Sequence, residues 1–215
     1  MVTIKVPTGE IFRAHAHLLA YHSDYFLAAL NSSMLEATTL QFNFTEYADE
    51  ESMEVFIFWI YEQSHIDWRY PPPVEFIERF GGPCGDRELD GKLAIKAYRM
   101  GDYLQAKRFK NEMIEVIYDY YDVEYVEENP LVSWSNVDLE TLHPQGKAFH
   151  LLAAMMGNAL YLMGYTEAKK LLDQLGLEAR AAVVEFMAMQ SLKLGCKPMP
   201  LFIADFLEPL GEDNE

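Results

Sequence analysis

Residues 2–30 of the chain are VTIKVPTGEIFRAHAHLLAYHSDYFLAAL, and a change of apolar period within this stretch decides the fold class. Residues 2–6 alternate between apolar and polar side chains, which is typical of a half-buried strand. The Pro-Thr-Gly-Glu turn at 7–10 and the short apolar run at 11–14 complete a predicted hairpin. From Leu18 onward the apolar side chains recur at helical spacing, so the sequence predicts two strands followed by helices.

Beyond this stretch the sequence alternates once more and is otherwise helical. Residues 40–44 place Leu, Phe and Phe on one face and polar side chains on the other, which predicts a third strand. Asp49 can cap a helix over residues 50–63, whose second half is apolar nearly all round. We therefore expect this helix in the core, with Phe56 and Ile60 on one buried face. Two more helices are expected over 93–100 and 103–121, separated by a break at Gly101-Asp102.

The predicted organisation has two helical parts joined by a stretch rich in acids, prolines and glycine. Residues 1–123 are expected to form an α+β domain, mostly helical, with a small three-stranded sheet and a loop-rich insertion at 64–92. After a linker at 124–146, residues 147–210 are expected to form a helical region that packs on this domain, because its apolar stripe is too wide to leave in water. Residues 211–215 form an acidic tail. The helices of the second region are expected at 147–163, 166–175 and 177–194.

The charge balance excludes several classes of partner. The chain has 215 residues, with 34 Asp and Glu against 17 Lys and Arg, for a formal net charge of −17. Such a surface repels nucleic-acid phosphates and anionic membranes. The uncharged run at 148–165 is interrupted by His, Asn and Gly, so we expect a buried helix there and no membrane span. The N-terminus lacks the features of a signal peptide, so a cytoplasmic or nuclear location is expected.

Sequence motifs for catalysis are few. The sequence has no Gly-rich phosphate loop, no nucleophile elbow and no paired cysteine ligands. A metal-dependent enzyme using His15, His17 and His22 is a remote alternative, because residues two apart share one face of a strand. The chain runs straight into a helix here, which separates the rings, so His15 is expected to pack and hydrogen-bond at the junction. We expect no enzyme activity, no cofactor and no metal.

Several ordered motifs together resemble the BTB/POZ domain, over roughly residues 1–121. The positions are mostly structural, so the resemblance is specific for the fold and weak for function. The last of the motifs resembles the variant common among fungal BTB proteins. The motifs are Phe12-x-Ala14-His15-x-x-Leu18-Leu19-Ala20-x-x-Ser23-x-Tyr25-Phe26, Met34-Leu35-Glu36 with Leu40-x-Phe42, Val55-Phe56-x-x-Trp59-Ile60-Tyr61, and Tyr98-Arg99-Met100-Gly101-Asp102-Tyr103-Leu104 with Phe109-Lys110-Asn111.

The resemblance implies a non-catalytic protein–protein interaction module that acts as a self-associating scaffold or as an adaptor. One kind of adaptor in this family recruits substrates to cullin-type ubiquitin ligases. The family's cullin contact motif is a hydrophobic residue, any residue and then Glu, which Met34, Leu35 and Glu36 fit. These three residues are the predicted partner-binding site, and the implied partners are proteins: a second copy of the chain or a cullin.

The sequence departs from the family pattern at two places. Many dimeric members exchange an N-terminal helix and strand between protomers, whereas this chain begins at the first strand. A homodimer, if formed, is therefore expected to lack that exchange. The insertion at 64–92 is also longer than the usual turn of the family at this position.

Overall fold

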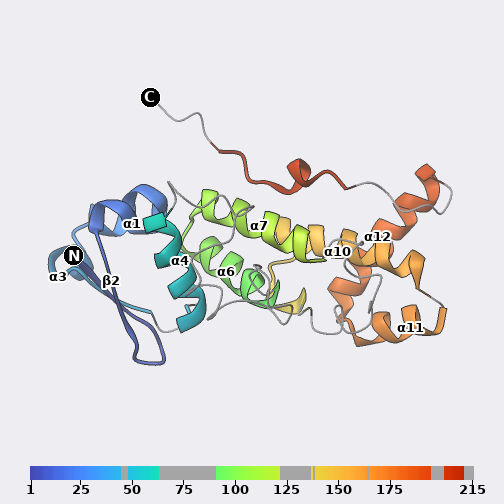
Figure 1. The fold of residues 1–215 in the computed structure, drawn as a ribbon, viewed down its shortest axis with the longest axis horizontal. Coiled ribbons are helices and arrows are strands. Elements are labelled where there is room, and N and C mark those ends of the chain that lie inside the picture. Colours follow the sequence, from blue (N-terminus) through green and yellow to red (C-terminus); the bar gives the residue numbers. More distant parts are fainter. Residues whose placement is uncertain are drawn as a thin grey trace. The chain divides into compact units, whose positions relative to one another are not determined.

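The computed structural model describes residues 1–44, 48–62, 91–121, 137, 139–163, 165–194 and 201–210, and Figure 1 shows the fold. The chain divides into two compact units: Met1–Met113 with Glu208–Glu215, and Ile114–Leu207. The expected insertion at 64–92, except its last two residues, lies outside the described residues, as do the tail at 211–215 and most of the linker at 124–146. The packing of the helical region 147–210 on the first domain stays a prediction.

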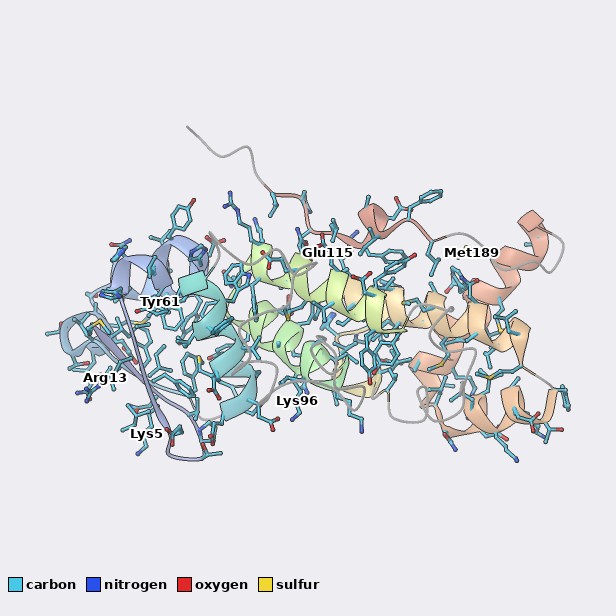
Figure 2. The ribbon with its side chains drawn as sticks, in the orientation of Figure 1. Lys5, Arg13, Tyr61, Lys96, Glu115 and Met189 are labelled. Carbon is cyan, nitrogen blue, oxygen red and sulfur yellow. The ribbon has the colours of Figure 1, made fainter. Side chains whose placement is uncertain are left out.

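A small mixed sheet forms from three strands in the order β2-β1-β3, namely β1 (Val2–Lys5), β2 (Ile11–Ala14) and β3 (Gln41–Asn43). β1 pairs antiparallel with β2 and parallel with β3. Gly9, at a φ of 93°, makes the hairpin turn that a side chain would strain. Val2 and Ile4 are fully buried, while Lys5 and Arg13 extend from the opposite, exposed face (Figure 2). The three strands predicted from the alternation are confirmed.

The helices of the first 121 residues that the structure describes are α1 (Ala16–His22), α2 (Asp24–Leu30), α3 (Leu35–Thr39), α4 (Glu50–Glu62), α6 (Gly91–Tyr103) and α7 (Lys107–Tyr121). Ser23 Oγ caps α2 by accepting from the Phe26 N–H at 3.2 Å. Asp49 Oδ1 accepts from the Ser52 N–H at 3.1 Å, which confirms the predicted cap of α4. The α+β fold expected from the sequence is therefore present, with helices predominating.

Helix α3 was not expected, since the sequence placed Met34, Leu35 and Glu36 between a helix end and a strand. The structure begins a helix at Leu35, with Met34 as its N-cap residue. Leu40 ends it in the left-handed region, at a φ of 55°, and donates its N–H to the Glu36 carbonyl at 2.8 Å. Five residues are too few to show a helical apolar period, which is why the pattern gave no signal.

The expected helix break at Gly101-Asp102 is wrong, because α6 continues through both residues to Tyr103. The chain turns at Gln105, whose φ is 53°. The N–H groups of Gln105 and Ala106 donate to the carbonyls of Asp102 and Gly101 at 3.1 and 2.8 Å, which is the Schellman arrangement. The glycine serves packing instead: a Cβ at Gly101 would lie 2.8 Å from Phe109 Cδ1.

The core of the first unit is aromatic and centres on α4. Phe56 and Trp59 pack on Phe109 of α7, with ring centroids 5.2 and 5.1 Å from that of Phe109. Phe56 is fully buried and Ile60 nearly so, which confirms the predicted phase of the helix. The indole N–H of Trp59 donates to Glu112 Oε2 at 2.8 Å, so its polar atom is satisfied within the core.

The second unit is helical, as expected. Its elements include η1 (Leu139–Thr141), α10 (Lys147–Leu162), α11 (Tyr165–Gln174), α12 (Leu177–Leu194) and η2 (Ile203–Phe206). Helices α10 and α12 approach closely at Gly157, where a Cβ would lie 2.6 Å from Phe186 Cδ1. α10 is buried along most of its length, as its uncharged sequence predicts. Among the helices described, none combines the length and apolar character that a bilayer span requires.

Candidate protein-interaction surface

The predicted contact motif lies at the exposed end of α3. Met34 and Leu35 are 63% and 73% exposed, while Glu36 in the first turn is half-buried. The Met34 N–H donates to Ser32 Oγ at 3.1 Å, and the Met34 carbonyl accepts from the Ala37 N–H at 3.2 Å. These bonds fix the backbone, so the structure presents two apolar side chains to solvent on a defined scaffold.

Glu36 is half-buried and lies near Tyr25. Burial, the neighbouring Tyr103 and the Glu36 carboxylate together raise the pKa of Tyr25 to about 12. Tyr25 in turn packs among aromatic rings, with the centroid of Phe44 at 5.9 Å and that of Tyr103 at 5.5 Å. Glu36 is therefore the less exposed member of the motif, while the two residues before it are exposed.

The rings of His15 and His17 lie close together, with centroids 5.6 Å apart, so the expectation that the start of α1 separates them is wrong. His15 Nδ1 hydrogen-bonds the Tyr61 hydroxyl at 2.7 Å, and the His15 N–H donates to the same oxygen at 3.0 Å. His22 instead packs edge-on against Trp59, with ring centroids 5.0 Å apart. Burial and the nearby Arg108 lower the pKa of His22 below its ordinary value. Within the described ranges, no group of three His, Cys, Asp or Glu side chains could hold a metal ion.

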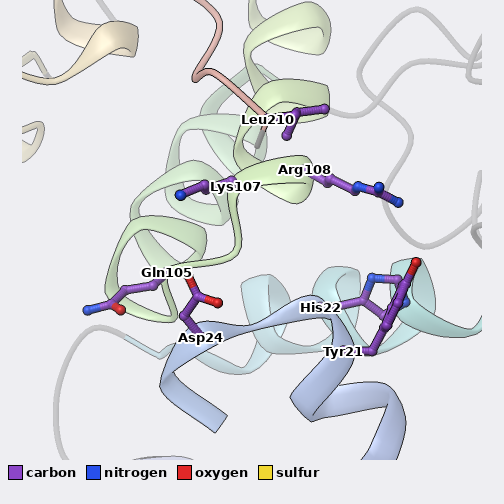
Figure 3. Close-up of a pocket in the computed structure, with 7 residues that line it drawn as sticks. All are labelled: Tyr21, His22, Asp24, Gln105, Lys107, Arg108 and Leu210. Atoms are coloured by element: carbon purple, nitrogen blue, oxygen red, sulfur yellow. The ribbon is translucent and has the colours of Figure 1, made fainter. Parts of the chain in front are cut away.

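A cavity of about 210 Å³ opens beside α1 and the start of α7 (Figure 3). Arg108 points to the side where Tyr21 and His22 lie, whereas Lys107 and Gln105 point the other way. The sequence offered no signal for this cavity, because its walls come from three segments far apart in the chain. The lining residues are Tyr21, His22, Asp24, Gln105, Lys107, Arg108 and Leu210.

Helix α12 carries apolar side chains on two faces, an inner one toward α10 and an outer one. Its inner face packs on α10, with Val183 fully buried. Its outer face carries an exposed stripe at spacings of four, three, four and four residues, which places the members on one side of the helix. Leu177 and Leu192 at its ends are 85% and 87% exposed. The members of this outer stripe are Leu177, Ala181, Val184, Ala188 and Leu192.

The described part of the chain thus combines a small mixed sheet, packed helices and exposed apolar side chains on α3 and α12. Residues 2–67 match the family model of the BTB/POZ domain. Such domains are protein–protein interaction modules and in general not enzymes. No curated protein matches the chain.

Proposed function

We propose that the chain is a non-catalytic scaffold that associates with a second copy of itself through the outer stripe of α12. The observation that carries the proposal is an apolar helix face that the described residues leave exposed. Large apolar residues at its two ends would be in water in an isolated chain, and their burial favours association. Surfaces of this kind mark protein–protein contacts.

The order of residues in the outer stripe favours a second copy as the occupant. In an antiparallel pair related by a two-fold axis close to Val184, Leu177 faces Leu192 and Ala181 faces Ala188. The stripe is thus complementary to itself, as a two-fold interface requires. The small alanines allow the two helices to approach closely, and the leucines close both ends of the contact.

The mass in solution tests this proposal. The wild-type chain is expected to dimerise at high micromolar concentration, more tightly at high salt because salt screens the repulsion between two chains of charge −17. Val184→Glu places two like charges beside the axis and should leave a monomer by sedimentation equilibrium. Gln174→Glu adds the same charge on the exposed surface of α11 and should not change the mass. A monomeric wild type at high salt would remove the proposal.

A second candidate function is that of a substrate adaptor for a cullin-type ubiquitin ligase, and the exposure of Met34 and Leu35 favours it. In this proposal Met34 inserts as an apolar anchor, while Glu36 holds the turn that presents it. An apolar anchor at the centre of an interface contributes a large share of the binding free energy. Met34→Ala should therefore weaken binding to a cullin N-terminal domain by about 1–2 kcal/mol, roughly five- to thirty-fold.

The control for the adaptor proposal is Met189→Ala, which removes another exposed methionine, on α12 (Figure 2). It should leave the cullin affinity unchanged. Both variants should keep the wild-type melting temperature, since neither side chain is buried. A lower melting temperature for Met34→Ala would assign that residue a structural role, and a wild-type chain without cullin affinity would eliminate this candidate.

A further inference from the structure

The C-terminal end of the described chain returns to the first unit and is held there by a side-chain amide. Asn111 Nδ2 donates to the Glu208 carbonyl at 2.9 Å, and the Glu208 N–H donates to Asn111 Oδ1 at 2.7 Å. Asn111 itself is only 8% exposed. One amide thus satisfies both main-chain groups of a residue 97 positions away, in the way that one strand pairs with another.

The lysine next to Asn111 binds the acidic side chain of Glu208. Lys110 is also 8% exposed, and its Nζ donates to Glu208 Oε1 at 3.0 Å and to Asp102 Oδ1 at 2.6 Å. Burial alone would lower the pKa of Lys110, but Asp102, Tyr98 and Glu208 together raise it. The ammonium group therefore stays charged beside one fixed acid, Asp102, and a second of its three N–H donors is matched by the Glu208 carboxylate.

Two residues further on, the segment presents an apolar side chain. Leu210 is half-exposed and lines the cavity of Figure 3, together with Tyr21, His22 and the two cationic side chains at the start of α7. Pro209 between them carries no N–H that would need a partner, and it biases the preceding residue toward an extended backbone. The surface formed by Lys110, Asn111 and the cavity thus contacts three features of the segment. These are its extended backbone, an acidic side chain and an apolar side chain two positions later.

These contacts are of a kind that another peptide can reproduce. They use main-chain groups and one carboxylate of the segment, and Pro209 and Leu210 stay exposed. Residues before Glu208 belong to the second unit, where Lys147 Nζ donates to the Asp205 carbonyl at 3.0 Å. Release of residues 208–210 therefore leaves that anchor and the buried core of the first unit in place.

We propose that Lys110, Asn111 and the cavity beside Leu210 form a recognition site for an extended peptide with an acid followed two residues later by an apolar side chain. The chain's own residues 208–210 occupy this site, and a partner protein binds by supplying a segment of the same chemistry that displaces them. This site is separate from the outer stripe of α12 and from Met34. The proposal can therefore be tested separately from the proposed scaffold and adaptor functions.

The test measures the affinity of a fluorescein-labelled peptide with the sequence of residues 205–210, DFLEPL, for the full chain by anisotropy. The double variant Glu208→Gln and Leu210→Ala weakens the internal segment and leaves the site intact. It should bind the peptide about ten-fold more tightly than the wild type, because an internal competitor acts at high effective concentration. Equal affinities of the two proteins would overturn the proposal.

Two controls separate recognition from nonspecific binding. A peptide with Gln in place of Glu loses the bond to the ammonium group and should bind the double variant about ten-fold more weakly. Asn111→Asp, added to the double variant, should abolish binding because its carboxylate cannot donate to a peptide carbonyl, whereas Asn43→Asp on the exposed face of β3 should not. The Gln peptide needs no change in the protein, so equal binding of both peptides overturns the proposal even if Asn111→Asp fails to fold.

Discussion

Replacement of Gly101 by alanine tests the packing of α6 on α7 most directly. Gly101 has ordinary helical geometry, so the backbone would accept alanine there without strain. The added methyl carbon would nevertheless lie 2.8 Å from Phe109 Cδ1 and 3.1 Å from Lys110 Cγ. Carbon atoms pack best at about 3.5–4.0 Å, so the first contact is a severe overlap. Phe109 is fully buried and wedged against Phe56 and Trp59, which leaves it little room to move.

Two opposing free energies decide the outcome of Gly101→Ala. Alanine gains about 1 kcal/mol over glycine in helix propensity. Overpacking of a well-packed core costs about 1–3 kcal/mol, and a ring that cannot move places this site in the upper part of that range. The net expectation is a loss of about 1–2 kcal/mol in the free energy of unfolding. For a chain of this length such a loss lowers the melting temperature by about 2–8 °C.

The assay is thermal and urea unfolding of Gly101→Ala, Phe109→Leu and the double variant. Phe109→Leu removes the clashing ring edge, so it should cost less in the Gly101→Ala background than alone. The two substitutions are therefore expected to be non-additive by more than about 0.5 kcal/mol. A higher melting temperature for Gly101→Ala would refute the reasoning, because the gain in helix propensity would then outweigh any steric overlap. Strict additivity of the two changes in unfolding free energy would show that Phe109 is not the group in contact.

Three further predictions concern other parts of the first unit. Phe56→Ala removes a fully buried ring and should lower the free energy of unfolding by about 3–5 kcal/mol, leaving little folded protein at physiological temperature in a circular dichroism melt. A melting temperature close to that of the wild type would contradict the assigned phase of α4. Tyr61→Phe removes both hydrogen bonds to His15 and should cost about 0.5–1.5 kcal/mol in urea unfolding, and an unchanged midpoint would show that these bonds contribute nothing. Burial and a nearby arginine lower the pKa of His22 in the folded state, so the unfolded chain binds the proton more readily, and stability should fall as the pH drops below about 6.5. His22→Gln should therefore flatten the pH dependence of the melting temperature between about pH 7 and 5.

The candidate site illustrates how far sequence reasoning reaches. A family motif points to Met34, Leu35 and Glu36, and the structure exposes the first two and leaves the third half-buried. The motif specifies the residue types at these positions, but it does not predict the short helix α3 that begins there. The outer stripe of α12 could have been found, since its spacing is visible in the sequence. Its exposure could not, because α12 is apolar on two faces and only the packing on α10 shows which one is buried.

Elements whose signals lie within one segment can be predicted from the sequence. The alternation at 2–6 and the caps at Ser23 and Asp49 join residues a few positions apart, so local periodicity and short-range hydrogen bonds suffice to predict them. Features that join distant segments become visible only in the folded chain. The glycine in α6 is required by a ring on another helix, and Asn111 pairs with Glu208, 97 positions later. Such contacts leave no period in the sequence, because the two partners come together only once the chain has folded.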